Sequence, residues 1–324
     1  MTSKRKNEFD CVETVCMICG AGESSVVARG KDYEYRTSER DFTFVACSTC
    51  GHVYLNPRPG DHCLHLAYPD NYYTVSGRHT SRQSAIIARL KSFVIKRRLR
   101  FFQELLKGRG RILEVGCGDG VLLVDLKTRN PQLDLVGLDL ALGKETIKRC
   151  KAMGITLMET SVEQADLGHD RYDLIIVNQV IEHVPDPAQV MQNLAKALKH
   201  GGYISIETPN RDGYDHTFFR RSFWGGYYFP RHLHLFDRDG LKSCVENSGL
   251  TVVYQGYLLA PIIWIFSIHA LLSHGLNEGR TKEMMSEIFS DRNPFCLAVF
   301  TLVDLLARLA GFPTSNQKII GRKY

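Results

Sequence analysis

Ile112–Gly120, which reads ILEVGCGDG, is the stretch of this 324-residue chain that decides the fold. An apolar run containing the acidic residue Glu114 leads into three glycines, Gly116, Gly118 and Gly120. Glycines at such a turn let the backbone approach a ligand without a clash at Cβ. The turn alone is weakly specific, because dinucleotide-binding folds use a similar one. Its GxGxG spacing differs from the GxGxxG of nicotinamide sites, and together with the acid ahead of it this sharpens the prediction of a cofactor site.

Short runs rich in Val, Ile and Leu alternate with helix-compatible stretches on both sides of this turn. The runs are RILEV, LDLVGLDL, ITLME, YDLIIVNQV and GYISIET. They suit strands buried on both faces of a parallel sheet, and Pro187–Lys199 between them reads as a helix that stops at glycines. Asp239–Ser248 reads as a later helix, and Leu250–Tyr257 and Gln317–Lys323 as two further strands. The order predicts an α/β fold with a doubly wound, Rossmann-like sheet.

A second acidic residue, Asp139, ends the strand after the glycine turn, about twenty residues on, where a ribose-binding carboxylate is expected. In order, the motifs ILEVGCGDG, LVGLDL, YDLIIVNQVIEHVPDP and LKHGGYISIETPN resemble those of class I S-adenosylmethionine (SAM)-dependent methyltransferases. The resemblance covers about residues 111–210. It implies a SAM-dependent methyltransferase domain over residues 108–324. The alternatives are a nucleotide fold with another ligand and a decayed site.

The resemblance also implies cofactor contacts by position. The glycine turn would line the amino-acid portion of SAM, Asp139 would bond the ribose hydroxyls, and Leu140 would pack on the adenine. Ser161 and Val162 would flank the adenine, although the family often has an acid near position 161 and this chain has none. Two residues at the end of the next strand would lie near the methionine end. The cofactor residues so predicted are Glu114, Gly116, Cys117, Gly118, Gly120, Asp139, Leu140, Ser161, Val162, Asn178 and Gln179.

Two CxxC pairs near the N-terminus, Cys16/Cys19 and Cys47/Cys50, are each followed by a glycine. Four thiolates in two such pairs match a tetrahedral structural Zn²⁺ site, which is closed and non-catalytic. The metal would stabilise a segment too short to fold around its own core. We therefore expect a zinc-ribbon-like module over residues 1–66. The first residues, MTSKRKNEFD, lack the apolar stretch of a secretory signal, so a cytoplasmic location is expected.

A looser resemblance extends this module. CGHVYLNPRP at 50–59 and YPDNYY at 68–73 resemble the N-terminus of a bacterial group of zinc-ribbon methyltransferases. Members that are understood include sugar C-methyltransferases, and many are associated with polysaccharide or secondary-metabolite synthesis. The resemblance implies a small-molecule or glycan acceptor, such as a sugar, nucleotide-sugar or lipid-linked saccharide, methylated at oxygen or carbon. It also places Tyr72 and Tyr73 over the cofactor as a lid.

Histidines supply the candidate bases, since methyl transfer often needs a proton removed near neutral pH. His183, in the motif IEHVPDP, follows the fourth strand at the ligand edge of such a sheet, with Glu182 beside it. His232 and His234, in YYFPRHLHLF, would share a strand face near the mouth of the site. For all of them a packing role weighs about as much as catalysis. Arg231 is a candidate clamp for a phosphate.

Residues 67–107 are assigned to a linker followed by a basic amphipathic helix over Ser81–Lys107. Two apolar stretches, Leu258–Leu272 and Pro294–Phe312, fall between the last two expected strands. The first is near the lower limit of ~17 residues for crossing a bilayer, and the second contains charges. We expect an apolar helical insertion over about residues 258–315 that is buried or lies on a membrane surface. With the basic helix it would favour anionic lipid at the inner face of the membrane.

Two competing functions remain open. A net charge of +6 permits an RNA or DNA methyltransferase that binds nucleic acid through the zinc ribbon and basic helix. The segment between the cysteine pairs, KDYEYRTSERDF, is mixed in charge, however, and lacks the basic stripe with interleaved aromatics that such a surface needs. A non-enzymatic scaffold is disfavoured by the intact glycine turn and Asp139. The oligomeric state is not predicted.

Overall fold

The computed structural model describes residues 9–69, 106, 109–275, 285, 288–290 and 293–324. Most of the basic helix expected over 81–107, together with Tyr72 and Tyr73, lies outside these residues. The described part contains a seven-stranded sheet in the order β12-β13-β10-β9-β6-β7-β8. Its strands are β6 (Arg111–Val115), β7 (Asp134–Asp139), β8 (Thr156–Glu159), β9 (Tyr172–Asn178), β10 (Leu198–Pro209), β12 (Thr251–Leu258) and β13 (Asn316–Arg322).

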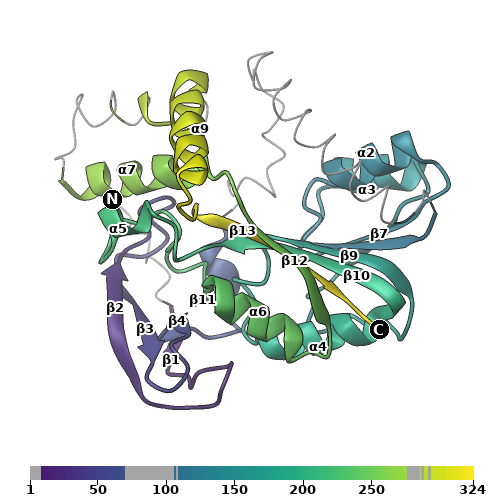
Figure 1. Ribbon diagram of the computed structural model, residues 1–324, viewed down its shortest axis with the longest axis horizontal. Helices are drawn as coiled ribbons and strands as arrows, with labels where there is room; N and C mark the ends of the chain where they lie inside the picture. The colour runs from purple at the N-terminus through teal and green to yellow at the C-terminus, as the bar shows by residue number, and fades with distance from the viewer. Residues whose placement is uncertain (1–8, 70–105, 107–108, 276–284, 286–287, 291–292) are drawn as a thin grey trace, which may run out of the picture.

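Helices cover both faces of this sheet (Figure 1). α2 (Val121–Arg129) and α3 (Lys144–Ala152) lie on one face, and α4 (Pro187–Ala197) and α6 (Arg238–Glu246) lie on the other. Successive residues of β6 point to opposite faces, as the pleat requires, so Ile112 joins the core under α2 and α3 while Leu113 joins the core under α4 and α6. The predicted doubly wound α/β fold is thus confirmed.

The sheet is mixed because β13 is antiparallel to both of its neighbours, β10 and β12. The expected apolar insertion joins β12 to β13 and contains α7 (Pro261–Gly275) and α9 (Pro294–Leu309). The connection brings the chain back along the edge it left, which gives antiparallel pairing without a crossover helix. None of the helices in the described ranges is long and apolar enough to cross a membrane.

A second, four-stranded sheet has the order β11-β4-β3-β2, from β2 (Ser24–Gly30), β3 (Phe42–Cys47), β4 (Val53–Leu55) and β11 (His234–Leu235). Three of these strands come from the N-terminal module, and β11 comes from the chain after the large sheet's fifth strand. Smaller elements complete the fold: β1 (Cys11–Val12), β5 (Arg58–Pro59), the 3₁₀ helix η1 (Leu64–Ala67) and α5 (His216–Phe219). One apolar core contains side chains from residues 9–67 together with residues 224–263. The N-terminal module therefore shares its core with the rest of the chain.

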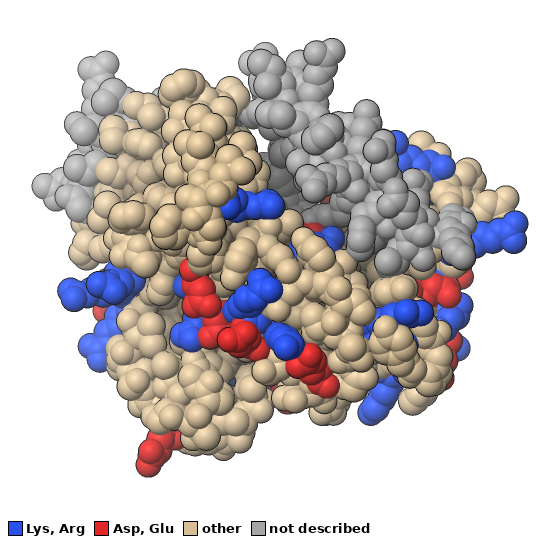
Figure 2. Space-filling view, in the orientation of Figure 1, with Lys and Arg blue, Asp and Glu red and all other residues tan. Residues whose placement is uncertain are grey.

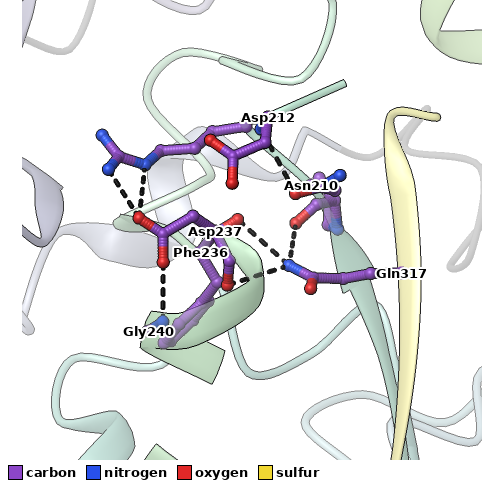
Figure 3. Close-up of polar contacts among 8 residues, drawn as sticks. Asn210, Asp212, Phe236, Asp237, Gly240 and Gln317 are labelled. Atoms are coloured by element: carbon purple, nitrogen blue, oxygen red, sulfur yellow. Dashed lines mark hydrogen bonds and ion pairs between the residues drawn. The ribbon is translucent and has the colours of Figure 1, made fainter. Parts of the chain in front are cut away.

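Polar contacts fasten the segment that leads into α6 to the large sheet (Figure 3). Gln317 of β13 points its amide toward that segment, and its Nε2 donates to the backbone oxygen of Phe236 at 3.1 Å. The carboxylate of Asp237 caps α6 by accepting from the Gly240 amide at 2.6 Å, and it also pairs with Arg211. These contacts hold residues 236–240 beside the carboxyl end of β10 and the start of β13.

Candidate active site

The glycine turn after β6 adopts the backbone that its sequence predicts. Gly116, Gly118 and Gly120 all have positive φ, at 71°, 53° and 69°. A Cβ on Gly116 would collide with the side chain of Val180, and one on Gly120 would lie 2.9 Å from the sulfur of Cys150. Glycine is therefore required both by conformation and by space. The turn presents backbone close to whatever ligand lies at this sheet edge.

Asp139 at the end of β7 is coupled to this turn. Its Oδ2 accepts a hydrogen bond from the Gly118 amide at 2.7 Å. Burial raises the pKa of Asp139, against hydrogen bonds from the backbone that lower it. The next residue, Leu140, has 69% of its surface exposed. A carboxylate and an exposed apolar side chain thus stand next to each other beside the glycine turn, as a ribose with an attached base would require.

The other predicted cofactor residues differ in what they can offer a ligand. The side chains of Cys117 and Val162 are buried in the apolar cores, so only their backbone could face a ligand. Ser161 accepts from the amide of Gln164 at 3.3 Å. Glu114 is buried at 6% exposure beneath the turn.

Asn178 and Gln179 end β9, the strand beside β6. The buried Oδ1 of Asn178 has no hydrogen-bond partner within the described part of the chain. Gln179 has a positive φ of 53°, and its Nε2 donates to Asn316 at 3.1 Å. The strained backbone and the orphaned oxygen both occur where a bound ligand would supply contacts.

Three of the four predicted catalytic residues come together. Glu182, His183 and His232 each contribute one donor or acceptor atom to a group whose members all lie within 4.8 Å of one another. The imidazole rings of His183 and His232 meet edge to face with centroids 4.7 Å apart. The turn that carries the first two begins at Val180, which packs over Gly116. The group therefore lies next to the glycine turn.

Hydrogen bonds assign the protons of the two imidazoles. Nδ1 of His183 lies 3.0 Å from the backbone oxygen of Arg231, and Nδ1 of His232 lies 2.7 Å from that of Gly226. A carbonyl oxygen can only accept, so each Nδ1 carries the hydrogen and each Nε2 keeps a lone pair. Burial lowers the pKa of His183 to about 4 and that of His232 well below its usual value. Both rings are neutral near pH 7 and can accept a proton at Nε2.

Glu182 is the acidic member of the group. Its Oε2 accepts from the hydroxyl of Thr208 at 2.8 Å, and its Oε1 faces Nε2 of His232 at 4.0 Å. Oε1 is buried and makes no hydrogen bond with any described residue. Burial raises the pKa of Glu182 to about 8, so the carboxyl group is mostly protonated at neutral pH.

His234 does not join this group. Its Nε2 donates to the backbone oxygen of Pro185 at 3.3 Å, and its Nδ1 lies 3.0 Å from Nε2 of His52 in the N-terminal sheet. Both ring nitrogens are thereby occupied. β11 begins at His234, and the ring of His232 packs elsewhere, on Tyr228 and His183, so the two side chains do not form the shared face that alternation suggested. The structure gives His234 the geometry of a bridge between the loop that precedes α4 and the N-terminal module.

Two further residues lie near the group, and the sequence did not predict the contact that either of them makes. The hydroxyl of Tyr68 lies 3.1 Å from Nδ1 of His183, although the two are 115 residues apart. Arg231 was a candidate phosphate clamp, but its side chain is fully buried and paired with Asp32. Neither contact can be found from spacing, because both depend on how the N-terminal module packs on the large sheet.

The four cysteines of the two CxxC pairs converge. Their sulfur atoms all lie within 4.8 Å of one another, with Cys16–Cys50 at 3.6 Å and Cys19–Cys47 at 3.5 Å. A tetrahedral zinc with Zn–S bonds of about 2.3 Å places its sulfurs about 3.8 Å apart. The glycine after each pair has positive φ and closes a tight turn onto the first cysteine of that pair. The donor set fits a structural Zn²⁺.

Comparisons with known proteins agree with the fold. Residues 86–255, just over half of the chain, match the family described as "Methyltransferase domain". A ubiquinone biosynthesis O-methyltransferase of Photobacterium profundum is 34% identical over 113 residues, which cover 33% of this chain and 47% of that protein. The corresponding Leptothrix cholodnii protein is 31% identical over 32% of this chain and 45% of its own length. The chain thus spans about half the length of these curated relatives.

Solved structures similar to this chain include a methyltransferase that matches most of its length. The 1,6-didemethyltoxoflavin-N1-methyltransferase of Burkholderia thailandensis, solved with bound 1,6-didemethyltoxoflavin and S-adenosylhomocysteine, has a TM-score of 0.50. The match covers 88% of this chain and 96% of that one, at 13% sequence identity. At that identity the likeness concerns the fold.

Proposed function

Because this chain belongs to the methyltransferase-domain family and is a SAM-dependent methyltransferase, we propose that it methylates a small-molecule or glycan acceptor. The acceptor atom would be an oxygen or a carbon. The observation that carries the proposal is the adjacency of the neutral His183–His232–Glu182 group to the glycine turn, through the contact of Val180 with Gly116. A proton acceptor beside a methyl donor is what transfer to a hydroxyl or an acidic carbon requires.

Each predicted cofactor residue would bind the part of SAM that lies nearest to it. Asp139 would accept hydrogen bonds from the ribose hydroxyls, and the exposed side chain of Leu140 would pack against the adenine. The positive-φ glycines would let the backbone lie against the amino-acid portion. Bound SAM supplies an electrophilic methyl group on a sulfonium. Tyr72 and Tyr73 remain proposed as a cover over it and lie outside the described residues.

Within the base group, His183 would take the proton. Its Nδ1–H is held by the Arg231 carbonyl, which orients the ring and leaves the Nε2 lone pair available. Its side chain is half-buried, whereas those of Glu182 and His232 are buried. The buried neighbours would act on the site by positioning the half-buried ring and keeping water out. The proton would leave the acceptor O–H or C–H and go to Nε2, and the freed electron pair would bond to the methyl carbon. The methyl–sulfur bond would break at the same time, and its electron pair would stay on the sulfur, which becomes a neutral thioether.

A structural zinc ion held by Cys16, Cys19, Cys47 and Cys50 is part of the proposal. It would tie together the two ends of the β2–β3 hairpin, whose loop packs on the segment that carries His232. The zinc would therefore act at a distance, by holding that hairpin in place.

The packing of the N-terminal module also bears on the nucleic-acid alternative. The loop between the two cysteine pairs buries Asp32 against Arg231. A loop engaged in this way is poorly placed to read a nucleic acid, which supports a small acceptor. The location in the cytoplasm remains an expectation of the sequence.

The acceptor can be identified with the full chain and methyl-labelled SAM. Extract of the host is incubated with the protein and labelled cofactor, then separated into small-molecule, saccharide and lipid-linked, and nucleic-acid fractions. Label in either of the first two, released as an O-methyl or C-methyl product, supports the proposal. Label that is confined to the nucleic-acid fraction and is removed by nuclease would contradict the proposal. A His183→Gln protein serves as the matched control for background labelling.

A further inference from the structure

The insertion between β12 and β13 packs against residues 213–223, which precede β11, and together they form a helical lobe. The lobe is defined here as the described residues 213–223, 259–275 and 294–315. Within it, α7 packs on α9, with Trp264 stacked on Phe300 at a centroid distance of 5.4 Å. The buried carboxylate of Asp304 joins the pieces, accepting from the Trp264 indole at 3.0 Å and from the Tyr214 hydroxyl at 3.2 Å. The only acid of α9 therefore faces inward.

The outward side of α9 is apolar. An outer stripe runs along it at helical spacing, with exposed fractions of 76%, 41%, 55%, 56% and 76% for Phe295, Val299, Leu302, Leu306 and Leu309. A surface helix of a globular protein normally turns polar side chains outward. Ten of the twenty exposed large apolar side chains in the described part of the chain lie in this lobe. Such concentration marks an interaction surface.

The charges of the lobe indicate which partner the surface fits. Its carboxylates are Asp215 and Asp304, both buried, whereas Arg220, Arg221 and Arg308 are all exposed. Figure 2 shows the area over α7 and α9 almost free of charged atoms, while red and blue atoms gather lower on the molecule. Every exposed charge among the described residues of the lobe is thus positive. Apolar side chains flanked by cations only are complementary to a bilayer surface that contains acidic lipids.

We propose that the outer stripe of α9 docks this enzyme onto an anionic membrane surface, with the leucines inserted among the lipids and the arginines at the headgroups. The helix lies in the plane of the interface and does not cross the bilayer, in agreement with its length of 16 residues. The proposal is independent of the acceptor, since it concerns where the protein lies and not what it methylates.

Vesicle flotation of the full chain tests this docking. Phosphatidylcholine vesicles with and without phosphatidylglycerol are compared for wild type and for the triple variant Leu302→Gln, Leu306→Gln, Leu309→Gln. Glutamine is a good helix former, so α9 should persist. We expect wild type to float with the acidic vesicles and the triple variant to bind at least about tenfold more weakly. Arg308→Gln should weaken binding to the acidic vesicles about fivefold.

The control replaces exposed apolar residues outside the lobe, Val26→Gln and Val253→Gln, and should bind as wild type does. Unchanged SAM affinity in every variant verifies folding. Equal flotation of the triple variant and wild type would overturn the proposal, as would equal binding to neutral and acidic vesicles. The proposal would also be overturned if wild type is a dimer, the triple variant is a monomer and neither protein floats with vesicles. The outer stripe would then bind a second copy of the chain.

Discussion

Arg231 and Asp32 form a fully buried, two-point ion pair across 199 residues of sequence. The guanidinium donates through Nη1 at 3.0 Å and Nη2 at 2.8 Å to the two carboxylate oxygens, and neither side chain is exposed. The guanidinium also lies over the rings of Tyr35 and Tyr228. This pair joins the N-terminal sheet to the segment that carries His232, so the site depends on it.

Arg231→Met should lower the free energy of unfolding by about 3–5 kcal/mol, because the carboxylate of Asp32 would be left buried without its partner. Urea denaturation measures the change. The variant that also carries Asp32→Asn should be less destabilised than Arg231→Met alone, since no charge is then stranded. Lys242→Met is the control, because its pair with Glu246 is exposed and should contribute less than about 1 kcal/mol. If Arg231→Met and Lys242→Met lower the free energy of unfolding by similar amounts, the buried Arg231–Asp32 pair does not have the stabilising role assigned to it.

The sequence was enough to predict those parts of the molecule whose structure is determined by neighbouring residues. The alternating apolar runs predicted the strands of the large sheet, and the glycine spacing predicted the turn beside Asp139. The two CxxC pairs predicted a cluster of four sulfurs, which the structure brings together. In each case neighbouring residues determine the backbone and the side-chain directions.

What the sequence could not predict depends on packing between distant segments. His234 reads as a possible base from its motif, yet it meets His52 from 182 residues away. Arg231 reads as a candidate clamp for a phosphate, yet its side chain is fully buried and paired with Asp32. β11 completes a sheet whose other strands come from the N-terminus, so no single stretch contains that sheet's pattern. Only the folded structure shows that His183 and His232 belong to the candidate base group and that His234 does not.

Removal of one cysteine of the cluster should remove most of the bound zinc. We expect the full chain to carry about one zinc per chain and Cys19→Ser to lose most of it, because three thiolates hold the ion far less tightly. Elemental analysis of the purified proteins measures the metal content. Cys11→Ser is the matched control, since this half-buried thiol lies outside the cluster of four. Equal zinc content in the two variants would show that the cluster is not the metal site.

Asp139→Asn should weaken SAM binding by about tenfold to a hundredfold. The carboxylate would accept charge-assisted hydrogen bonds from the ribose, and each such bond contributes about 1.5–3 kcal/mol. Isothermal titration with SAM measures the affinity. Asp134→Asn changes a carboxylate at the opposite end of the same strand, β7, and should bind SAM as wild type does. Unchanged affinity in Asp139→Asn would remove this residue from the cofactor site.

His183→Gln should lower the rate of methyl transfer by about a hundredfold or more while leaving SAM affinity unchanged, since it removes the proton acceptor alone. The product found by labelling supplies the assay. His234→Gln is the comparison. Its ring bridges Pro185 and His52, so this change should lower stability and leave the rate per folded molecule nearly intact. Equal rates in wild type and His183→Gln would assign the base to another residue.

Glu182→Gln should stabilise the protein increasingly as the pH rises from about 4.5 to 8. Burial raises the pKa of Glu182 from 4.5 to about 8, so the folded chain holds a proton that the unfolded chain releases above pH 4.5. The stability contributed by the protonated carboxyl is complete below pH 4.5 and is lost as the pH approaches 8. Glutamine mimics the protonated form and avoids this loss, so the variant should gain on the order of 4 kcal/mol over wild type near pH 8. Urea denaturation across this range measures the difference, with the exposed Glu246→Gln expected to shift stability by less than about 0.5 kcal/mol.

A stability difference between Glu182→Gln and wild type that stays constant with pH would mean that the carboxyl group is ionised in the folded protein. Glu182 would then be a charged partner for His232 and not a neutral one.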